Sequence, residues 1–211
     1  MIGAMYTAHL ALFYLPRNPN SEAANSSRAP KANIPDRHLL LLGSVASLAP
    51  IPSQVQYAIS KHGVLGMFRA LRATSFTNGV RVNMLCPYFI DTPLIPISGR
   101  LILAGGATGK PEDVVDAGTR FMADSRIIGR ALAIGPKIKV DDDWQLVPKN
   151  SNEGKEIAAW EVNAHDFDEV DIFTARFVRL INQVEIARGW VGFVFDTAKA
   201  FTYPLRRWWR G

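Results

Sequence analysis

Two short apolar runs with a helical pattern between them constrain the fold of this chain more than any other feature. The first run is His38–Leu42 (HLLLL), closed by a glycine, and the second is Val80–Pro87 (VRVNMLCP). Runs of this length are typical of strands buried on both faces in a parallel sheet. Residues Gln56–Thr74 have helical spacing. A strand, a helix and a strand in this order predict a parallel α/β sheet with a right-handed crossover.

The alternation of helix and strand continues on both sides of this unit. Gly3–Leu15 is apolar over enough of its circumference to predict a buried helix, which ends at Pro16. Arg17–Asp36 is rich in Pro, Asn, Ser and Ala and predicts a surface loop. Pro111–Met122 predicts a helix with proline in its first turn, and Arg130–Ile134 (RALAI) predicts a last short strand. These elements extend the α/β pattern.

The character of the chain changes after residue 136. Lys137–Glu156 is polar and predicts a loop, whose three adjacent aspartates, Asp141–Asp143, favour a solvated turn over a metal site because no second ligand cluster is spaced to complete one. We therefore expect no metal. Asp166–Arg188 has apolar residues at helical spacing and predicts an amphipathic helix. The expected organisation is an α/β domain at residues 1–136, then a polar loop and helical extension at 137–211.

The end of the chain mixes aromatic and basic residues, from Phe193 to the cluster Arg206–Arg210. Such a tail could rest on a membrane surface or on a partner. The favoured alternative is a terminal helix whose aromatic side chains pack on the body of the protein.

Cysteine content and charge limit the possible cellular compartment and partners. The one cysteine, Cys86, excludes an intramolecular disulfide, and its apolar surroundings predict a buried core residue. No basic residue precedes the N-terminal apolar run and no small-x-small site follows it, so we expect no signal peptide and a cytoplasmic location. The net charge of +5 could suit an anionic partner, although solubility explains it equally well. Nothing indicates nucleic-acid binding.

The residues that suggest chemistry are Tyr57 and Lys61, four apart in YAISK at the start of a predicted helix. This spacing puts a phenol and an ammonium on the same helix face. Such a pair arises by chance in many chains, where it usually lies on a solvated helix face. Its surroundings make it more specific, because Ser44 follows the first predicted strand thirteen residues before Tyr57 and Thr92 follows the second strand.

With GSVAS at a strand end, YAISK on a helix and CPYFIDTPL after the next strand, the sequence resembles the short-chain dehydrogenase/reductase family. The resemblance covers residues 1–136 and implies part of a Rossmann-like, doubly wound parallel sheet. The family's first strands and its glycine-rich phosphate-binding turn are not among these residues. Residues 137–211 are similar to an extension of fungal members that resemble 15-hydroxyprostaglandin dehydrogenase.

The resemblance implies catalytic roles for Ser44, Tyr57 and Lys61. Tyr57 would exchange a proton with the substrate oxygen as hydride moves to or from nicotinamide. The positive charge of Lys61 would favour the phenolate. Ser44 would donate a hydrogen bond to the substrate oxygen. Asn83, in the second predicted strand, fits a common family position that we interpret as structural.

The resemblance also implies the cofactor contacts, which are Tyr57, Lys61, Ile90 and Thr92. Lys61 would hold the nicotinamide ribose hydroxyls, while Ile90 and Thr92 match a loop that contacts the carboxamide and phosphates. Tyr88 stands where the family usually has glycine, which could alter the backbone angles of this loop. The cofactor would be NADP or NAD, with NADP preferred.

Two functions are consistent with these features. The first is an NAD(P)-dependent oxidoreductase that interconverts an alcohol and a ketone on a small apolar metabolite in fungal secondary metabolism. The second is a catalytically inactive remnant that acts as an interaction or dimerisation partner. Gly3–Leu15 and Gln56–Thr74 resemble the helices that pair subunits in the family, so we expect a homo-oligomer.

Overall fold

The computed structural model divides the chain into two compact units, Met1–Ala164 and His165–Gly211, which are described separately. The first unit carries the sheet and the candidate site. The compact unit continues beyond residue 136, where the family resemblance was expected to end. The residues that the structure describes are 1–24, 34–72, 75–95, 97–104, 108–148, 150, 153–162, 177, 180, 183–184, 186–195 and 197–198.

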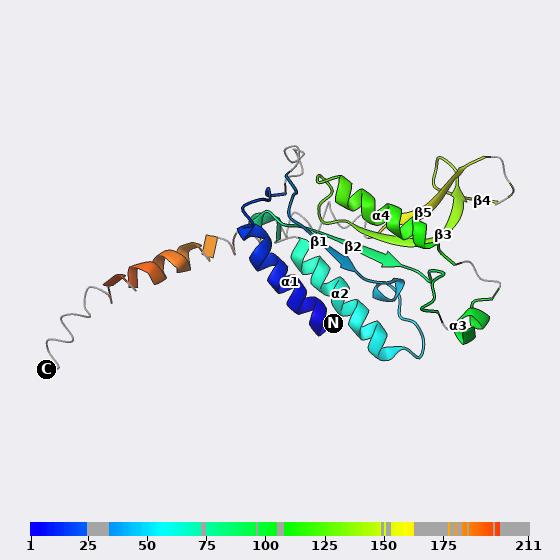
Figure 1. Cartoon of the computed structure of the whole chain (residues 1–211), viewed down its shortest axis with the longest axis horizontal. Coiled ribbons are helices and arrows are strands. Elements are labelled where there is room, and N and C mark those ends of the chain that lie inside the picture. The colour runs from blue at the N-terminus through cyan, green and yellow to red at the C-terminus, as the bar shows by residue number, and fades with distance from the viewer. Residues whose placement is uncertain are drawn as a thin grey trace. The chain divides into compact units, whose positions relative to one another are not determined.

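A five-stranded sheet forms the centre of the first unit (Figure 1). Its first three strands are parallel and adjacent in the order β1, β2, β3, while β4 and β5 each pair antiparallel with β3. The strands are β1 (His38–Leu42), β2 (Arg81–Pro87), β3 (Ala131–Val140), β4 (Leu146–Val147) and β5 (Lys155–Glu161).

Helices lie on both faces of this sheet (Figure 1). One apolar cluster joins the first two long helices to one face, and a second cluster joins α4 to the other. The predicted parallel α/β architecture is therefore confirmed, and three predicted helices are within two residues of the observed ends. The helices are α1 (Ile2–Tyr14), α2 (Val55–Arg72), α3 (Ile97–Ile102) and α4 (Pro111–Ala123), with short 3-10 turns η1 (Leu15–Arg17), η2 (Val45–Ser47) and η3 (Ser75–Asn78).

Burial along the parallel strands follows their place in the sheet. β2 lies between two neighbours, and its residues from Arg81 to Cys86 are all buried, as an apolar run predicts. β1 ends the described part of the sheet, so Leu39 and Leu41 are buried in the core while Leu42 is 61% exposed. Burial on both faces, expected for each strand, is thus complete only for β2.

The prediction of a loop at Lys137–Glu156 was wrong. β3 continues to Val140 instead of ending at Ile134, and β5 returns beside it. Lysines alternate with apolar residues in the added part of β3, so the segment reads as polar although it has the period of a strand. The turn between β3 and β4 is held by Asp141, whose Oδ1 accepts hydrogen bonds from the backbone N–H groups of Asp143 and Gln145 at 3.0 and 2.8 Å.

A buried polar network holds α4 and the loop after it against the sheet. Arg81 is fully buried, pairs with Asp36, and donates to the carbonyl oxygens of Met122 and Ile127 at 3.3 Å each. Asn83 on the same strand donates to the Ile127 carbonyl at 2.9 Å, which confirms its structural role. The Arg81 charge and the Asn83 amide are stable in the core because each has hydrogen-bond partners there.

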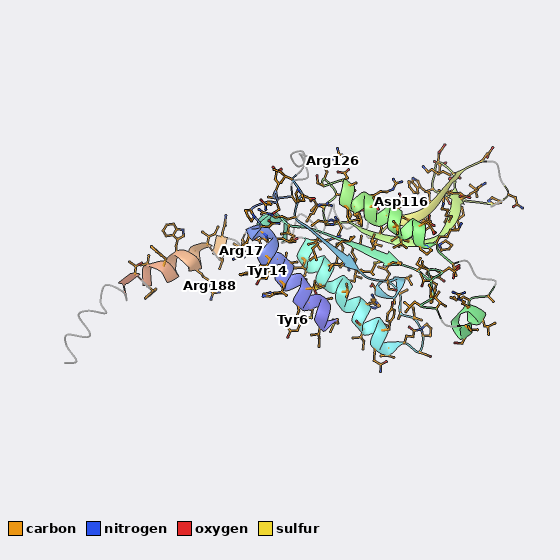
Figure 2. The ribbon with its side chains drawn as sticks, in the orientation of Figure 1. Tyr6, Tyr14, Arg17, Asp116, Arg126 and Arg188 are labelled. Atoms are coloured by element: carbon orange, nitrogen blue, oxygen red, sulfur yellow. The ribbon has the colours of Figure 1, made fainter. Side chains whose placement is uncertain are left out.

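We predict that Arg81→Met destabilises the first unit by about 3–5 kcal/mol, because it leaves the partly buried Asp36 carboxylate without this partner and the carbonyls without a donor. Arg126→Met is the matched control, since Arg126 pairs with Asp124 at an exposed site (Figure 2) and should leave stability nearly unchanged. Chemical denaturation of both variants measures the difference. Equal stability of the two variants would contradict the structural role of Arg81.

Candidate functional site

Ser44, Tyr57 and Lys61 come from the strand end and the helix that meet at the carboxyl edge of the parallel strands. Ser44 is the N-cap of η2, two residues after the end of β1, while Tyr57 and Lys61 lie in the first part of α2. The carboxyl ends of parallel strands share one edge, which is the usual ligand-binding edge of an α/β sheet.

Lys61 connects α2 to the end of β1. Its Nζ donates hydrogen bonds to the carbonyl oxygens of Leu42 and Gly43, at 3.2 and 3.1 Å. A lysine at this position therefore fixes the distance between the helix and the strand end, and it brings a positive charge to the site.

Tyr57 lies one helical turn before Lys61, and its ring centroid is 5.7 Å from Lys61 Nζ. The Tyr57 side chain is 42% exposed. The predicted shared face of the two residues is therefore present in the structure, and the phenol can be reached by a ligand.

Ser44 is held in place by its neighbours in the turn. Its backbone is extended, its Oγ accepts a hydrogen bond from the backbone N–H of Ala46 at 3.2 Å, and its own N–H donates to Ser47 Oγ at 3.2 Å. Ser44 Oγ also donates to the carbonyl oxygen of Pro87 at 3.5 Å, at the end of β2. This last bond is long, so a closer acceptor can replace it.

Gly43 leaves room for this arrangement. A Cβ there would meet the terminal methyl of Met84 and would lie 2.9 Å from Ser47 Oγ and 3.2 Å from Cys86 Sγ. Since all three neighbours are buried, the strand end can pack this closely on β2 only because residue 43 has no side chain.

Cys86 is a core residue, as predicted, and is 1% exposed. Burial raises the pKa of its thiol to about 11, against the opposing effects of the Ser44 backbone and the Lys61 charge. Its thiol is therefore protonated at neutral pH and is not a nucleophile.

The loop after β2 continues beside β3 and carries Tyr88, Ile90 and Thr92. The Tyr88 N–H donates to the Ile134 carbonyl oxygen at 2.7 Å, and Ile90 forms a parallel bridge with Gly109. Among the non-glycine residues that the structure describes, positive φ occurs at Ser53 and Trp144, so Tyr88 has ordinary backbone angles in place of the family's glycine. The side chains of Ile90 and Thr92 are half-buried.

Trp160 on β5 is an aromatic residue near the loop after β2 that the sequence patterns did not single out. Trp160 pairs with Ala133, which pairs with Cys86, so it shares the sheet face that α2 covers. A Cβ at Gly135 would lie 3.8 Å from the Trp160 ring and 3.9 Å from Tyr88 Cβ, so both aromatic residues flank this glycine. The short apolar run Ile157–Trp160, with Glu156 before it and Glu161 after it, was the signal for a strand here.

Metal chemistry has no support in the described residues. Within those ranges, the structure contains no group of three or more His, Cys, Asp or Glu side chains that could hold a metal ion. The Asp141 carboxylate, in the acidic run considered above, instead accepts hydrogen bonds from its own turn.

A family model and several known proteins are similar in sequence to this chain. Residues 38–97 match the family model described as short chain dehydrogenase. The chain is 32% identical over 157 residues to 5'-hydroxyaverantin dehydrogenase of Dothistroma septosporum, covering 68% of this chain and 48% of the relative. It is 41% identical over 59 residues to 15-hydroxyprostaglandin dehydrogenase of Mus musculus, whose name specifies NAD(+), covering 27% of this chain and 22% of the relative. The chain thus spans about half the length of the first relative and less of the second.

A solved structure shows the same fold. The 3-hydroxyacyl-CoA dehydrogenase type-2 from Mycobacterium avium superposes with a TM-score of 0.50 at 23% sequence identity, over 71% of this chain and 55% of that chain. At this identity the similarity concerns the fold alone.

We predict that Gly43→Ala destabilises the chain by about 1–3 kcal/mol, because the added methyl displaces Met84 and Ser47 in a packed core. Gly66→Ala is the control, since no heavy atom lies within 4 Å of a Cβ at this position of α2. That variant should be more stable by up to about 1 kcal/mol, from helix propensity. Thermal unfolding compares the two, and a stable Gly43→Ala variant would show that the strand end does not need this close approach.

Proposed function

The chain belongs to the short-chain dehydrogenase/reductase family, and from this premise we propose that it takes part in NAD(P)-dependent interconversion of an alcohol and a ketone. The observation that carries the proposal is the position of Lys61, which joins the helix that bears Tyr57 to the strand end that bears Ser44. One cation, one exposed phenol and one fixed hydroxyl at the ligand-binding edge are the groups that such a reaction needs.

The residues at this edge fit a nicotinamide dinucleotide. The Tyr57 phenol is exposed beside the Lys61 ammonium, so both can reach ribose hydroxyls, and Ile90 and Thr92 are proposed to contact the rest of the cofactor. When bound, this group supplies the hydride chemistry. We propose NADP over NAD, which the name of a similar protein, the NADP-dependent dehydrogenase M3 of Phoma sp., supports.

Tyr57 is proposed as the residue that moves the proton. Its hydroxyl oxygen would give a proton to the substrate oxygen when a ketone is reduced and take one when an alcohol is oxidised. Lys61, with Nζ 5.7 Å from the Tyr57 ring centroid, would stabilise the negative charge that develops on the Tyr57 oxygen.

Ser44 is proposed to orient the substrate oxygen. Its hydroxyl makes a 3.5 Å hydrogen bond to the Pro87 carbonyl, which a substrate oxygen closer to Ser44 would replace. Because Ala46 and Ser47 already hold Ser44, little rearrangement would be needed when the substrate binds.

The proposed substrate is a small apolar metabolite. Tyr88 and Trp160 flank Gly135, and the strand residue opposite Trp160 is Ala133. Small residues with aromatic residues beside them favour a flat apolar ligand. The fungal relative is named for 5'-hydroxyaverantin, which supports a place in fungal secondary metabolism.

We also propose a homo-oligomer formed through α1 and α2, as the family resemblance implied. Large apolar side chains of α1 are exposed, among them Ile2 and Tyr6, and α2 exposes Val55 and Ile59. Tyr6 can be followed on α1 in Figure 2. Exposed apolar surface of this extent favours association.

We predict that Tyr57→Phe lowers turnover by at least about 100-fold, because the variant keeps the ring and loses the group that moves the proton. The assay follows nicotinamide absorbance during oxidation of 1-tetralol, a bicyclic apolar alcohol, with NADP+ or NAD+. Tyr6→Phe, which removes an exposed hydroxyl on α1, should keep full turnover. Circular dichroism checks that both variants fold. Turnover by Tyr57→Phe equal to that of the unaltered chain would contradict the proposal.

A further inference from the structure

The second unit contains a helical stretch whose large apolar side chains are exposed. Residues 186–195 are helical and are drawn in orange in Figure 1. Six side chains in these ten residues are apolar, large and more than half exposed. They are Ile186, Trp190, Val191, Phe193, Val194 and Phe195.

These side chains are distributed unevenly around the helix. At 3.6 residues per turn, Arg188, Gly189 and Gly192 share a sector of roughly 100°, and the large apolar residues cover an arc of roughly 200° on the other side. Arg188 is labelled on this helix in Figure 2. The helix therefore has a narrow side, formed by Arg188 and two glycines, and a wide apolar side.

An apolar arc this wide does not suit packing against a single neighbour. A surface helix of a globular protein needs an apolar stripe of about 100° or slightly more to contact its core. An exposed apolar surface of this size in water marks a site of interaction. A lipid interface accepts such a helix, because the acyl region surrounds the apolar arc while the narrow polar side faces water.

The charge of the segment favours an anionic surface. From Ile186 to the end of the sequence there is one acidic residue, Asp196, and five basic residues. Seven aromatic residues lie in the same stretch, four of them near the basic residues at the end. Tryptophan, tyrosine and arginine together are typical of segments at the boundary between lipid headgroups and acyl chains. The basic residues are Arg188, Lys199, Arg206, Arg207 and Arg210, and the aromatic residues are Trp190, Phe193, Phe195, Phe201, Tyr203, Trp208 and Trp209.

We propose that the segment from Ile186 to the end of the sequence binds the surface of membranes that contain anionic phospholipids. The helix lies in the plane of the membrane, with Trp190 and Phe193 among the side chains in the acyl boundary. In the part of the chain that the structure describes, no helix is long and apolar enough to cross a bilayer. The proposed cytoplasmic location fits this partner, because the cytoplasmic leaflet carries anionic lipids.

This proposal differs from the favoured sequence interpretation, in which the aromatic residues of the tail pack on the body of the protein. The reason for the change is the apolar arc of roughly 200° on this helix, which is wider than the stripe that one neighbour covers. The proposal does not depend on the dehydrogenase chemistry, because none of the candidate site residues lies in this segment.

Co-sedimentation of the full chain with sucrose-loaded vesicles tests the proposal. One set of vesicles contains phosphatidylcholine alone, and the other contains about one quarter phosphatidylserine. The chain should pellet with the anionic vesicles, bind the neutral ones less, and lose binding as salt is raised. A sample without vesicles corrects for aggregation. A chain that stays in the supernatant with both sets of vesicles overturns the proposal.

Matched variants separate the helix from other exposed aromatic residues. The double variant Trp190→Ser with Phe193→Ser should weaken vesicle binding by at least about tenfold, because it removes two large side chains from the apolar arc. Trp144→Ser, at a position in the first unit that is 63% exposed, should bind as the unaltered chain does. Equal binding by the double variant would overturn the proposal.

Two further experiments test the role of the basic residues and the self-association of the chain. Arg206→Glu with Arg207→Glu should reduce the preference for anionic over neutral vesicles, and an unchanged preference would contradict the role of the basic residues. Light scattering shows whether the segment instead joins copies of the chain. An oligomer that dissociates in the double variant, together with absent vesicle binding, would replace the membrane with a second copy as the partner.

Discussion

The hydrogen bonds from Lys61 to the carbonyl oxygens of Leu42 and Gly43 are the interaction on which the candidate site depends. They hold the first turns of α2 against the end of β1, and therefore set where Tyr57 lies relative to Ser44. The close approach of Gly43 to Met84 and Cys86 brings the same strand end against β2. We propose that these contacts bring Ser44, Tyr57 and Lys61 into one site.

The two ends of the parallel strands differ in the burial of their polar side chains. At the amino end, Arg81 and Asn83 are buried and hold the end of α4 through fixed hydrogen bonds. His38 belongs to this network, and burial followed by the Arg81 charge lowers its pKa to about 4, so it is neutral at physiological pH. At the carboxyl end, Tyr57 and Tyr88 are exposed. The amino end is therefore held by buried hydrogen bonds, while the carboxyl end has two exposed phenols.

The sequence predicted the strands and helices whose apolar pattern reflects burial, and it predicted the family from motifs after β1, in α2 and in the loop after β2. It did not predict the extension of β3 or the strand β5, because lysines and glutamates on exposed strand faces read as loop residues. Trp160 was missed for the same reason. Its place beside Gly135 depends on pairing between β3 and β5, which is a contact between residues far apart in the sequence. The predicted extension helix at 166–188 lies mostly outside the described residues.

Titration of the purified chain with NADPH and with NADH, followed by nicotinamide fluorescence, tests most directly whether Ser44, Tyr57 and Lys61 form a working site. We expect saturable binding of at least one of the two, and weaker binding in Lys61→Met, because that variant loses both the cation and the hydrogen bonds to the end of β1. Absence of saturable binding to the folded chain, or equal binding by the Lys61→Met variant, would contradict the dehydrogenase assignment and favour the interaction function.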